Sequence, residues 1–590
     1  MKSFEVSDSV LTSLQGFVQC NPSLTLVESE KIIYRKQNTT NGKKTVGLIS
    51  GGGAGHEPTH AGFVGKGMLT AAVSGDIFAS PSTRQILNAI KLVNNDPSTN
   101  GVLLIIKSYT GDILHFSLAA ERAKAIGINC EIACVGDDVA VGREKGKFVP
   151  RRALAGTVLV HKCVGAFAEL YSDKYGVAGC QKVANILNDN LVTIGASLDH
   201  CQVPGRKYES ELTENQMELG MGIHNEPGVQ VLEPIPSAEK LVGEYMLPKL
   251  LDPKDKNRYF VDFEKNDDVI LLVNNLGGVS NFVITSIVKI TTDLLLKNYN
   301  IKPKHTISGT LMTAFNGNGF SITLINASKT SKSLSESFQS LDINLFDLLN
   351  HPTDATSWPQ QHDLSKIAPP TYNPSILKEE ITAQPAGKFD FALFSKMIQG
   401  GAESIIKAEP HITELDTHVG DGDCGYTLAA GAKGINENLT SIPHKSLSIT
   451  LAYISDLVEK YMGGTSGGLY SLLITGISKG VITYCGENEQ VTPETLAKSL
   501  EYGLETLYRS TNARPGDYTM VDALEPFIKT FEKTKNFSEA VLAAKKGAEQ
   551  TAKIDAKFGR ASYVGSTTNI PDPGAVGFYE FVAGMEKAAK

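Results

Sequence analysis

Short apolar runs that end in glycine-rich or polar turns recur through the first half of the chain. Apolar runs of about four to eight residues, bounded by such turns, are typical of buried β-strands, whereas longer periodic segments are typical of helices. On this basis residues 166–198 are predicted to be largely helical. Strands are predicted over 45–49, 101–106, 268–275, 311–315 and 320–326, and 127–135 and 156–163 are further apolar runs.

The pattern changes after residue 350. Residues 351–386 are rich in proline, threonine and glutamine and contain Trp358, the only tryptophan, and this composition is typical of an interdomain linker. Beyond this segment, apolar positions recur with helical periodicity and strand patterns become scarce. Helices are predicted over 389–409, 445–461, 466–484, 493–510, 521–533 and 538–558.

These patterns predict a multidomain chain, because 590 residues are too many for one hydrophobic core. We expect an α/β domain over residues 1–350, then the linker over 351–386 and an all-α domain over 387–590. The α/β domain is expected to have two lobes, at about 1–190 and 191–350, since the pattern of a strand followed by a glycine-containing turn recurs in the second.

Composition and charge narrow the class of protein. A formal net charge of −8 argues against a nucleic-acid-binding protein, which usually carries a basic patch. No apolar run approaches the ~20 residues that cross a bilayer, and the first residues have no signal-peptide core, so no membrane partner is expected. The eight cysteines form no CxxC pair, which favours reduced thiols in a cytoplasmic protein.

Two polar turns follow predicted strands of the first lobe and carry ionisable side chains. Lys107 and Asp112 follow the 101–106 run, although Asp112 can also cap the next helix. Ligands bind beyond the carboxyl ends of strands in α/β sheets, so we expect both turns to line one pocket. The turn that follows the first predicted strand matches neither a GxGxxG fingerprint nor a P-loop. It is predicted to be a ligand-binding loop, and a tight structural turn is the alternative. It follows the 45–49 run and reads Gly51, Gly52, Gly53, Ala54, Gly55 and His56.

The stretch from Glu218 to Gly228, ELGMGIHNEPG, places one histidine on a loop. Its three glycines loosen the backbone, and Pro227 prevents a helix from running through. Neutral imidazole is a nucleophile near pH 7, because its ordinary pKa is about 6.5. His224 is therefore a candidate nucleophile, and the alternative is a turn in which it only hydrogen-bonds a neighbour.

Three carboxylates crowd into one predicted loop of the second half, at Asp416, Asp421 and Asp423. Carboxylate oxygens suit Mg²⁺, and a bound cation relieves the repulsion among them. The spacing does not fit an EF-hand, and a solvated acidic turn is the alternative. Further along, the glycine-rich segment 463–468 opens a predicted helix, where backbone amides can hold a phosphate, although a close helix contact would need glycines as well.

Taken together, the motifs resemble one enzyme family. GGGAGHEP, KSYTGD, ELGMGIHNEPG, DGDCGYTL, GGTSGGLY, RPGDYTMVDAL and DPGAVG occur in the order seen in ATP-dependent dihydroxyacetone kinases, the triokinase and glycerone kinase family. The resemblance covers almost the whole chain outside the linker. It implies an α/β, two-lobed substrate (K) domain followed by an all-α, helical-barrel nucleotide (L) domain. It also implies ATP as the direct donor, because the sequence supplies no phosphorylated partner of the kind that bacterial relatives need.

The resemblance assigns substrate-side roles to matching positions. It implies that His224 holds the carbonyl carbon of dihydroxyacetone as a covalent hemiaminal. It also implies that Asp112 is the base on the attacking hydroxyl and that His56 assists. Serine is common at the position of Ala54, so this chain loses any side-chain hydrogen bond there. The residues expected to hold the substrate are Gly53, Ala54, Gly55, His56, Lys107 and Asp112.

On the nucleotide side, the resemblance implies two Mg²⁺ ions held by Asp416, Asp421 and Asp423. Arg560 would contact phosphate, with a surface salt bridge as the alternative. The residues expected to line ATP are Cys424, Gly425, Tyr426, Thr427, Thr465, Ser466, Met520, Arg560, Asp572, Pro573 and Gly574.

Three activities stay open on this resemblance. The first is phosphorylation of dihydroxyacetone and of glyceraldehyde. The second is a cyclising FAD-AMP lyase, which occurs in some animal relatives and would use the nucleotide domain. The third is a sensor that binds its ligand without turnover, although the three aspartates, the phosphate loop and His224 together argue against it. The family also implies a homodimer in which one chain's nucleotide domain faces its partner's substrate domain.

Overall fold

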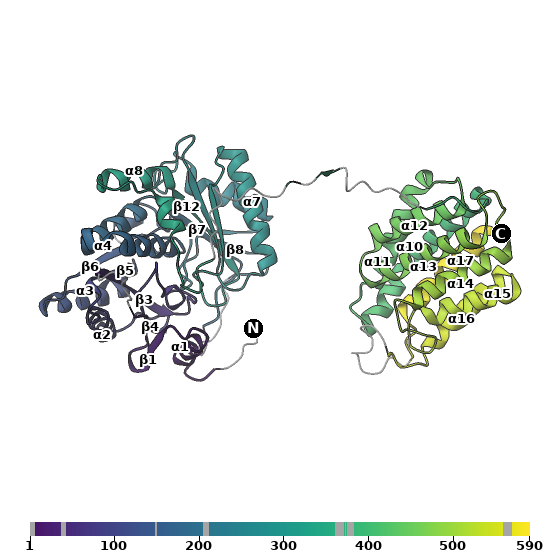
Figure 1. The fold of residues 1–590 in the computed structure, drawn as a ribbon, viewed down its shortest axis with the longest axis horizontal. Coiled ribbons are helices and arrows are strands. Elements are labelled where there is room, and N and C mark those ends of the chain that lie inside the picture. The colour runs from purple at the N-terminus through teal and green to yellow at the C-terminus, as the bar shows by residue number, and fades with distance from the viewer. Residues whose placement is uncertain are drawn as a thin grey trace. The chain divides into compact units, whose positions relative to one another are not determined.

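The computed structural model describes residues 6–36, 43–147, 150–203, 212–359, 371, 373–374, 383–557 and 569–590 (Figure 1). The chain divides into two compact units, Met1–Pro370 and Thr371–Lys590, and each is described by itself. The first unit mixes strands and helices and the second is helical, so the predicted fold class is confirmed. None of the helices in these ranges is long and apolar enough to span a membrane.

The first lobe is built on a six-stranded sheet. Its order is β1 (Thr25–Val27), β2 (Ile32–Tyr34), β4 (Ala71–Ile77), β3 (Thr45–Ala54), β5 (Thr99–Lys107) and β6 (Cys130–Val135). The last four strands are parallel, so their carboxyl ends meet at one edge. Helices α2 (Thr83–Asn94) and α3 (Thr110–Ala125) cover one face, and α1 (Ser9–Cys20) precedes the sheet.

The second lobe also has a six-stranded sheet. Its order is β11 (His305–Gly309), β10 (Val269–Asn275), β12 (Gly319–Asn326), β7 (Leu191–Ser197), β8 (Met217–Leu219) and β9 (Gln230–Leu232). One face packs against α7 (Asn281–Tyr299), α5 (Ala238–Lys240), the π-helix η5 (Leu241–Met246) and α6 (Leu247–Leu251). The other face packs against α8 (Ala327–Ser337) and α9 (Leu345–Asn350).

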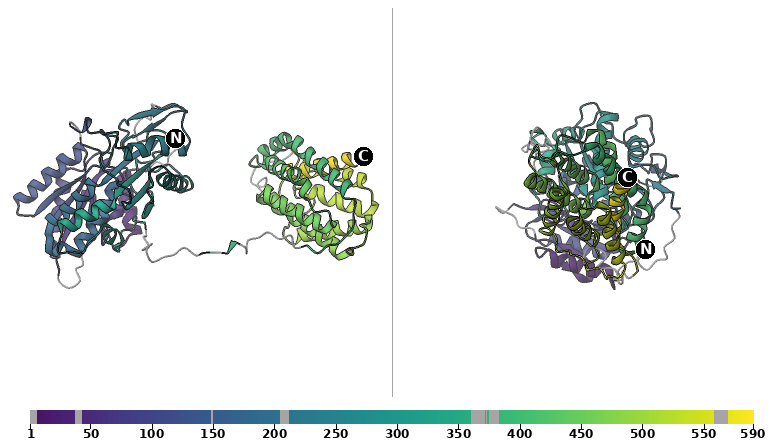
Figure 2. Two further views of the ribbon diagram at one scale, coloured as in Figure 1. Left: turned by 90° about the horizontal axis from the view of Figure 1, so that it is seen from above. Right: turned by 90° about the vertical axis from the view of Figure 1, so that its right-hand side faces the viewer.

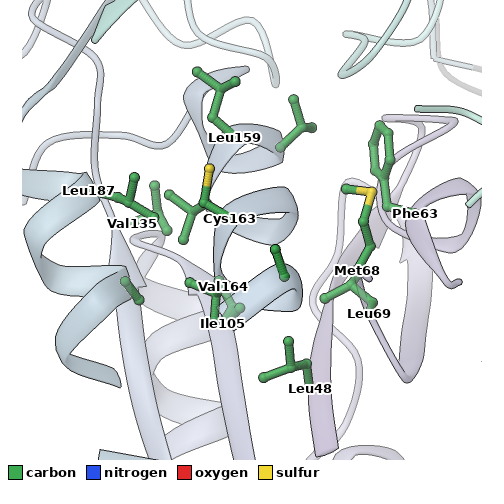
Figure 3. Packing of buried hydrophobic residues seen from close by; sticks show 14 of the residues in the cluster. Leu48, Phe63, Met68, Leu69, Ile105, Val135, Leu159, Cys163, Val164 and Leu187 are labelled. Carbon is green, nitrogen blue, oxygen red and sulfur yellow. The ribbon is translucent and has the colours of Figure 1, made fainter. Parts of the chain in front are cut away.

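Helix α4 (Gly156–Asp189), whose two segments meet at a kink at Gly176, contacts both sheets and joins their cores. Every residue from 156 to 168 is buried, and a helix that is apolar all round is stable only inside a core. Figure 3 shows Leu159, Cys163 and Val164 of α4 in one apolar cluster with Val135 and Ile105 of the first sheet. The two lobes therefore share α4 as a common support.

The second unit is a closed ring of eight α-helices, counted over its described residues (Figures 1 and 2). Each helix contacts the next in sequence, and the last contacts the first. The helices enclose an apolar cavity of about 520 Å³ and form the predicted helical barrel. They are α10 (Phe391–Val419), α11 (Cys424–Asn438), α12 (Leu447–Met462), α13 (Gly464–Tyr484), α14 (Pro493–Tyr508), α15 (Val521–Thr534), α16 (Phe537–Thr551) and α17 (Pro573–Ala589).

Several predicted elements of the first unit are wrong in detail. The helix predicted over 166–198 begins at Gly156 and ends at Asp189, so the apolar run 156–163 is its first part. Residues 191–197 form β7, a strand buried along its whole length, whose apolar pattern cannot be told from that of a buried helix. Residues 311–315 form a loop and not a strand. The Thr313 and Phe315 amides bond to the His56 turn, and the Leu311 and Met312 amides bond to the Asn274 side chain, so no strand ladder forms.

In the second unit, α11 and α17 are missing from the predicted helices. Their first turns contain Gly425, Pro573 and Gly574, which indicate loops when only local sequence is considered. The first predicted helix also ends too early, because α10 continues through Pro410 to Val419. Packing in a closed ring outweighs the glycine in α11 and Pro410 in α10, whereas Pro573 stands at the first position of α17 behind its Asp572 cap, where proline favours a helix.

The predicted linker lies largely outside the described residues. Trp358, within its predicted bounds, is only 6% exposed and packs in the core that includes α4. The chain is described again continuously from residue 383, and Ala386 is buried in the second unit. The linker bounds of 351 and 386 remain a prediction.

Two glycine substitutions should have opposite effects on the stability of the first unit. A Cβ atom at Gly165 of α4 would lie 2.5 Å from the Gly67 carbonyl oxygen, so we expect Gly165→Ala to destabilise by about 1–3 kcal/mol. Gly16 lies inside α1 with no atom near its Cβ position, so Gly16→Ala should stabilise by about 0.5–1 kcal/mol. Urea unfolding followed by Trp358 fluorescence measures both, and equal effects would contradict the close approach of α4 to the 67–68 turn.

Candidate active site

The glycine turn after β3 places His56 inside the first unit. His56 is fully buried, and its Nδ1 lies 2.8 Å from the Thr313 carbonyl oxygen of the second lobe. The Phe315 amide donates to the Gly55 carbonyl at 2.7 Å, and the Thr59 hydroxyl donates to the Leu311 carbonyl at 2.6 Å. The 311–315 loop thus fixes a turn that belongs to the other lobe.

The glycines of this turn are required by Phe78. Phe78 has a φ of 57°, unusual for a non-glycine residue, and follows β4 directly. A Cβ at Gly53 would lie 2.9 Å from the Phe78 Cα, and one at Gly55 would lie 2.7 Å from its ring. The ring stacks on His56 with centroids 5.1 Å apart. Glycine at these two positions therefore lets an aromatic ring close over the histidine.

His224 reaches the same place from the second lobe. Its Nε2 lies 2.9 Å from the Nε2 of His56, and its Nδ1 lies 2.8 Å from a carboxylate oxygen of Glu226. Phe78 and Tyr109 meet the His224 ring edge-on, with centroids 5.1 and 4.7 Å away. The loop histidine is therefore oriented by a carboxylate on one nitrogen and by a second imidazole on the other.

These contacts show that Nδ1 of each imidazole ring carries a hydrogen. The Thr313 carbonyl only accepts, so His56 Nδ1 carries a hydrogen, and the Glu226 carboxylate makes His224 Nδ1 a donor as well. The two Nε2 atoms can therefore bond to each other only when one of them carries an added proton. Burial, followed by the charges of Lys107 and His224, lowers the pKa of His56 well below its usual range, so His56 readily gives up an added proton.

The carboxylate beside His224 stays ionised. Burial alone would raise the pKa of Glu226, but hydrogen bonds from the His224 ring and amide, and the charges of His224 and Arg152, lower it to about 2. Glu226 can therefore balance a positive charge that develops on the His224 ring.

Lys107 and Asp112 lie at the carboxyl end of β5 and in the first turn of α3, and both are buried. Asp112 is not a helix cap, because its Oδ1 accepts a hydrogen bond from the Ser80 hydroxyl at 2.5 Å. Burial raises the pKa of Asp112, although Lys107 and Ser80 oppose this. Among the described residues, Lys107 Nζ has no hydrogen-bond partner. A buried ammonium without an acceptor is costly, and a ligand hydroxyl would satisfy it.

The structure therefore brings the predicted residues of both turns and the His224 loop together. It also adds Glu226, Phe78, Thr313, Ser80 and Arg152, whose roles the sequence alone does not indicate. Of these five residues, only Glu226 could have been suspected from the sequence, because it lies two residues after His224 on the same loop. The other four come from segments whose contact with the histidines depends on the fold.

In the second unit, the three aspartates form one cluster. Asp416 lies in the last turn of α10, Asp421 and Asp423 follow in the 420–423 turn, and one carboxylate oxygen of each lies within 4.8 Å of the others. Asp416 is buried, and its Oδ2 accepts the Cys424 amide at 2.9 Å, which fixes the start of α11. Three carboxylate oxygens so close together repel one another and suit a hard divalent cation, so this donor set fits Mg²⁺.

The other predicted nucleotide residues that the structure describes lie at the same end of the barrel. The charges of Asp522 and Asp416 act on Asp572, so the α14–α15, α10–α11 and α16–α17 connections lie near one another. Tyr470, in the second turn of α13, is in turn within reach of Cys424 and Asp572. Asp572 caps α17 by accepting the Ala575 amide at 2.7 Å. Burial, with the charges of Asp522 and Asp416, raises the pKa of Asp572 to about 7.

Apart from Arg560, the predicted nucleotide residues come from the starts of four helices or from the turns before them. Cys424 to Thr427 form the first turn of α11, where Gly425 is buried and Tyr426 exposed. Thr465 and Ser466 open α13, and Met520 precedes α15. A Cβ at Gly574 would lie 3.5 Å from the Met520 Cβ, so these two connections touch. Arg560 lies outside the described residues.

Comparison with known proteins agrees with both halves of this description. The Dak1 domain model matches residues 15–341, and the DAK2 domain model matches residues 418–587. Dihydroxyacetone kinase 1 of Saccharomyces cerevisiae is 62% identical over 588 residues, which cover 100% of this chain and 99% of the relative. Triokinase/FMN cyclase of Rattus norvegicus is 36% identical, over 96% of this chain and 94% of the relative.

A solved structure resembles the chain over its whole length. The dihydroxyacetone kinase from C. freundii in complex with AMP-PNP and Mg²⁺ matches with a TM-score of 0.64 and 30% sequence identity, over 99% of both chains. A Dak1 and a DAK2 domain follow one another in a single polypeptide, in the order found in these relatives. The chain therefore belongs to the dihydroxyacetone kinase family.

Proposed function

We propose that this protein transfers the γ-phosphoryl group of ATP to a hydroxyl of dihydroxyacetone, and also acts on glyceraldehyde. The observation that carries the proposal is the direct contact between His56 and His224, next to the buried Lys107 and Asp112. Relatives named dihydroxyacetone kinase or triokinase cover nearly the whole chain, and the C. freundii enzyme was solved with AMP-PNP and Mg²⁺.

The substrate carbonyl would be held by His224. Its Nε2 lone pair forms a bond to the carbonyl carbon, and the carbonyl oxygen takes the proton that lay between the two imidazoles. The product is a hemiaminal with a neutral hydroxyl, while the alkylated His224 ring keeps its Nδ1–H and carries the positive charge. Glu226, 2.8 Å from that nitrogen, balances the charge. Atoms and charge are conserved, because the proton of the pair only moves to oxygen.

This tether would select for carbonyl compounds. Imidazole adds to a ketone or an aldehyde but not to an alcohol, so glycerol has no electrophilic carbon for His224. Hydroxyl recognition alone separates such similar molecules poorly, because both offer the same terminal groups. Lys107 and the amides of the glycine turn would hold the free hydroxyls.

Phosphoryl transfer then needs a base and charge neutralisation more than further covalent chemistry. Asp112 would accept the proton of the attacking hydroxyl, and its raised pKa makes it a stronger base than an exposed aspartate. Asp416, Asp421 and Asp423 would hold two Mg²⁺ ions, which neutralise phosphate charge when bound. The residues at the same end of the barrel, from Cys424 to Gly574, would line the nucleotide.

We further propose a homodimer in which the nucleotide domain of one chain serves the substrate domain of its partner. The family resemblance supports this arrangement, and a long linker is compatible with it.

Two other activities compete with this proposal. The mammalian relatives are named triokinase/FMN cyclase, which supports a cyclising FAD-AMP lyase on the nucleotide domain. Incubation with FAD and Mn²⁺ decides it, since release of AMP would add the lyase whether or not His224 is present. A ligand sensor without turnover is the other alternative, and ADP release from the native protein excludes it.

Replacing His224 with alanine should remove most kinase activity. We expect native protein to release ADP from Mg-ATP with dihydroxyacetone and hardly at all with glycerol. The variant should lose about 100-fold or more in kcat/KM, because the tether supplies the orientation of the substrate. His351→Ala is the matched control, since the ring of this histidine contacts Glu169 of α4 rather than the His224 loop. Equal phosphorylation of glycerol would leave the kinase intact but contradict the covalent role of His224.

The acid limb of the pH profile should respond to Ser80. Asp112 must be ionised to act as a base, so kcat/KM falls as the pH falls through its pKa. The Ser80 hydroxyl lowers that pKa, and Ser80→Ala should therefore move the acid limb to higher pH while leaving the alkaline limb in place. Ser117→Ala, further along α3, serves as the control. An unchanged acid limb would mean that another group is the base.

Asp421→Asn should weaken activation by Mg²⁺ at least tenfold, since a loss of about 1.4 kcal/mol of ligand binding already gives that factor. The measurement is a titration of ADP release with Mg²⁺ at saturating ATP. Glu437→Gln, an exposed carboxylate elsewhere on α11, should leave the titration unchanged. A normal Mg²⁺ dependence in the Asp421 variant would contradict the assignment of the acidic cluster.

A further inference from the structure

One arginine holds the loop that carries His224. The Arg152 guanidinium donates to the Gly220 carbonyl at 2.6 Å through Nη2, and to the Glu226 and Pro227 carbonyls at 3.3 and 3.2 Å through Nη1. These carbonyls stand on both sides of His224. The side chain is buried, although it comes from the segment before α4 and lies far from the loop in sequence.

The other side of the guanidinium is anchored between the lobes. Its Nε donates to Asp138 Oδ2 at 2.8 Å, and Asp138, which is fully buried, also accepts the Ala140 amide at 2.8 Å. The neighbouring Asp137 accepts the Leu154 amide at 2.7 Å and the hydroxyl of Thr193 on β7. Arg152 is thus tied to the support shared by both lobes and not to the loop alone.

The loop has little order of its own. Between β8 and β9 its chain contains Gly220, Gly222 and Gly228, and Gly220 has a φ of 80°. A Cβ at Gly222 would lie 2.8 Å from Arg152 Nη1 and 2.8 Å from the Glu226 carboxylate carbon. Arg152 and Glu226 therefore both pack against the backbone at Gly222. The positive charge of Arg152 lies near the Glu226 carboxylate, which orients His224.

We propose that Arg152 is a positioning residue for His224, fixing the loop by three carbonyl contacts and placing its charge beside Glu226. The inference rests on the proposed covalent role of His224. A buried ion pair such as Arg152–Asp138 is seldom a source of stability, because desolvation offsets the attraction, so a guanidinium here is better explained by geometry. Lysine cannot replace it, since an ammonium lacks the planar fork that reaches three carbonyls and Asp138 together.

Arg151 provides a matched control next to it in the chain. Its guanidinium stacks on the Phe260 ring, 4.2 Å from the centroid, and its Nη1 has no partner among the described residues. Both arginines are largely buried, but only Arg152 contacts the His224 loop. A general effect of losing a buried guanidinium would appear in both lysine variants, whereas a positioning effect would appear in Arg152→Lys alone.

The test combines kinetics with a direct measurement of the adduct. Dihydroxyacetone labelled with ¹³C at its carbonyl carbon reports by NMR the fraction of bound ligand that has become a tetrahedral hemiaminal. We expect Arg152→Lys to lower this fraction and to reduce kcat/KM for dihydroxyacetone by about 10- to 100-fold, with the KM for Mg-ATP unchanged. Arg151→Lys should match the native protein in both measurements.

The controls separate the two proposals. An adduct that is absent from the native protein, or that persists in His224→Ala, would overturn the covalent role of His224 itself. An adduct lost in His224→Ala but normal in Arg152→Lys would overturn only the role of Arg152. If Arg152→Lys does not fold, Asp138→Asn decides the matter, because it frees the anchored side of the guanidinium and should lower the adduct fraction in the same way.

Discussion

The site of the first unit depends on one hydrogen bond, 2.9 Å long, between the Nε2 atoms of His56 and His224. A direct bond between two rings tolerates little movement, because hydrogen bonds weaken steeply with distance and angle. The two histidines belong to different lobes, so the lobes must be held in a fixed relation. Three features do this: the 311–315 loop bonded to the His56 turn, helix α4 between the sheets, and Arg152 between Asp138 and the His224 loop.

The same region buries an unusual number of charges. Lys107, Asp112, Asp138 and Arg152 are each less than a tenth exposed, and each desolvated charge costs free energy that its partners only partly return. Such groups persist where they are needed for chemistry or for geometry. Lys107 and Asp112 face the proposed substrate, whereas Asp138 and Arg152 support the loop behind it. The extensive apolar core around α4 offsets this local cost.

The second unit solves a different problem with a different architecture. A ring of antiparallel helices brings every second connection to one end, so residues from four separate connections gather without any strand. The acidic cluster occupies one connection, and the Asp572 cap occupies another. Burial, together with the like charges of Asp522 and Asp416, raises the pKa of Asp572, and the crowded carboxylates of the acidic cluster suit a cation.

Local sequence determined much of this protein. Apolar runs followed by glycine marked β3, β5 and β10, because a buried strand needs a continuous apolar segment and a sharp end. It also singled out His56, Lys107, Asp112 and His224 as side chains at strand ends or on a constrained loop. The acidic cluster was visible because its members stand within a few residues of one another.

Only the tertiary structure decided how these groups meet. His56 and His224 are 168 residues apart, and the carbonyl that sets the His56 proton lies 257 residues away. Arg152 follows Arg151 in the chain, and nothing local distinguishes the one that holds the loop from the one that stacks on Phe260. Gly425 in the first turn of α11 favours a loop locally, and packing in the ring overrules it. Residue type and periodicity are properties of neighbouring positions, whereas a shared proton or a carbonyl clamp exists only once distant segments are packed together.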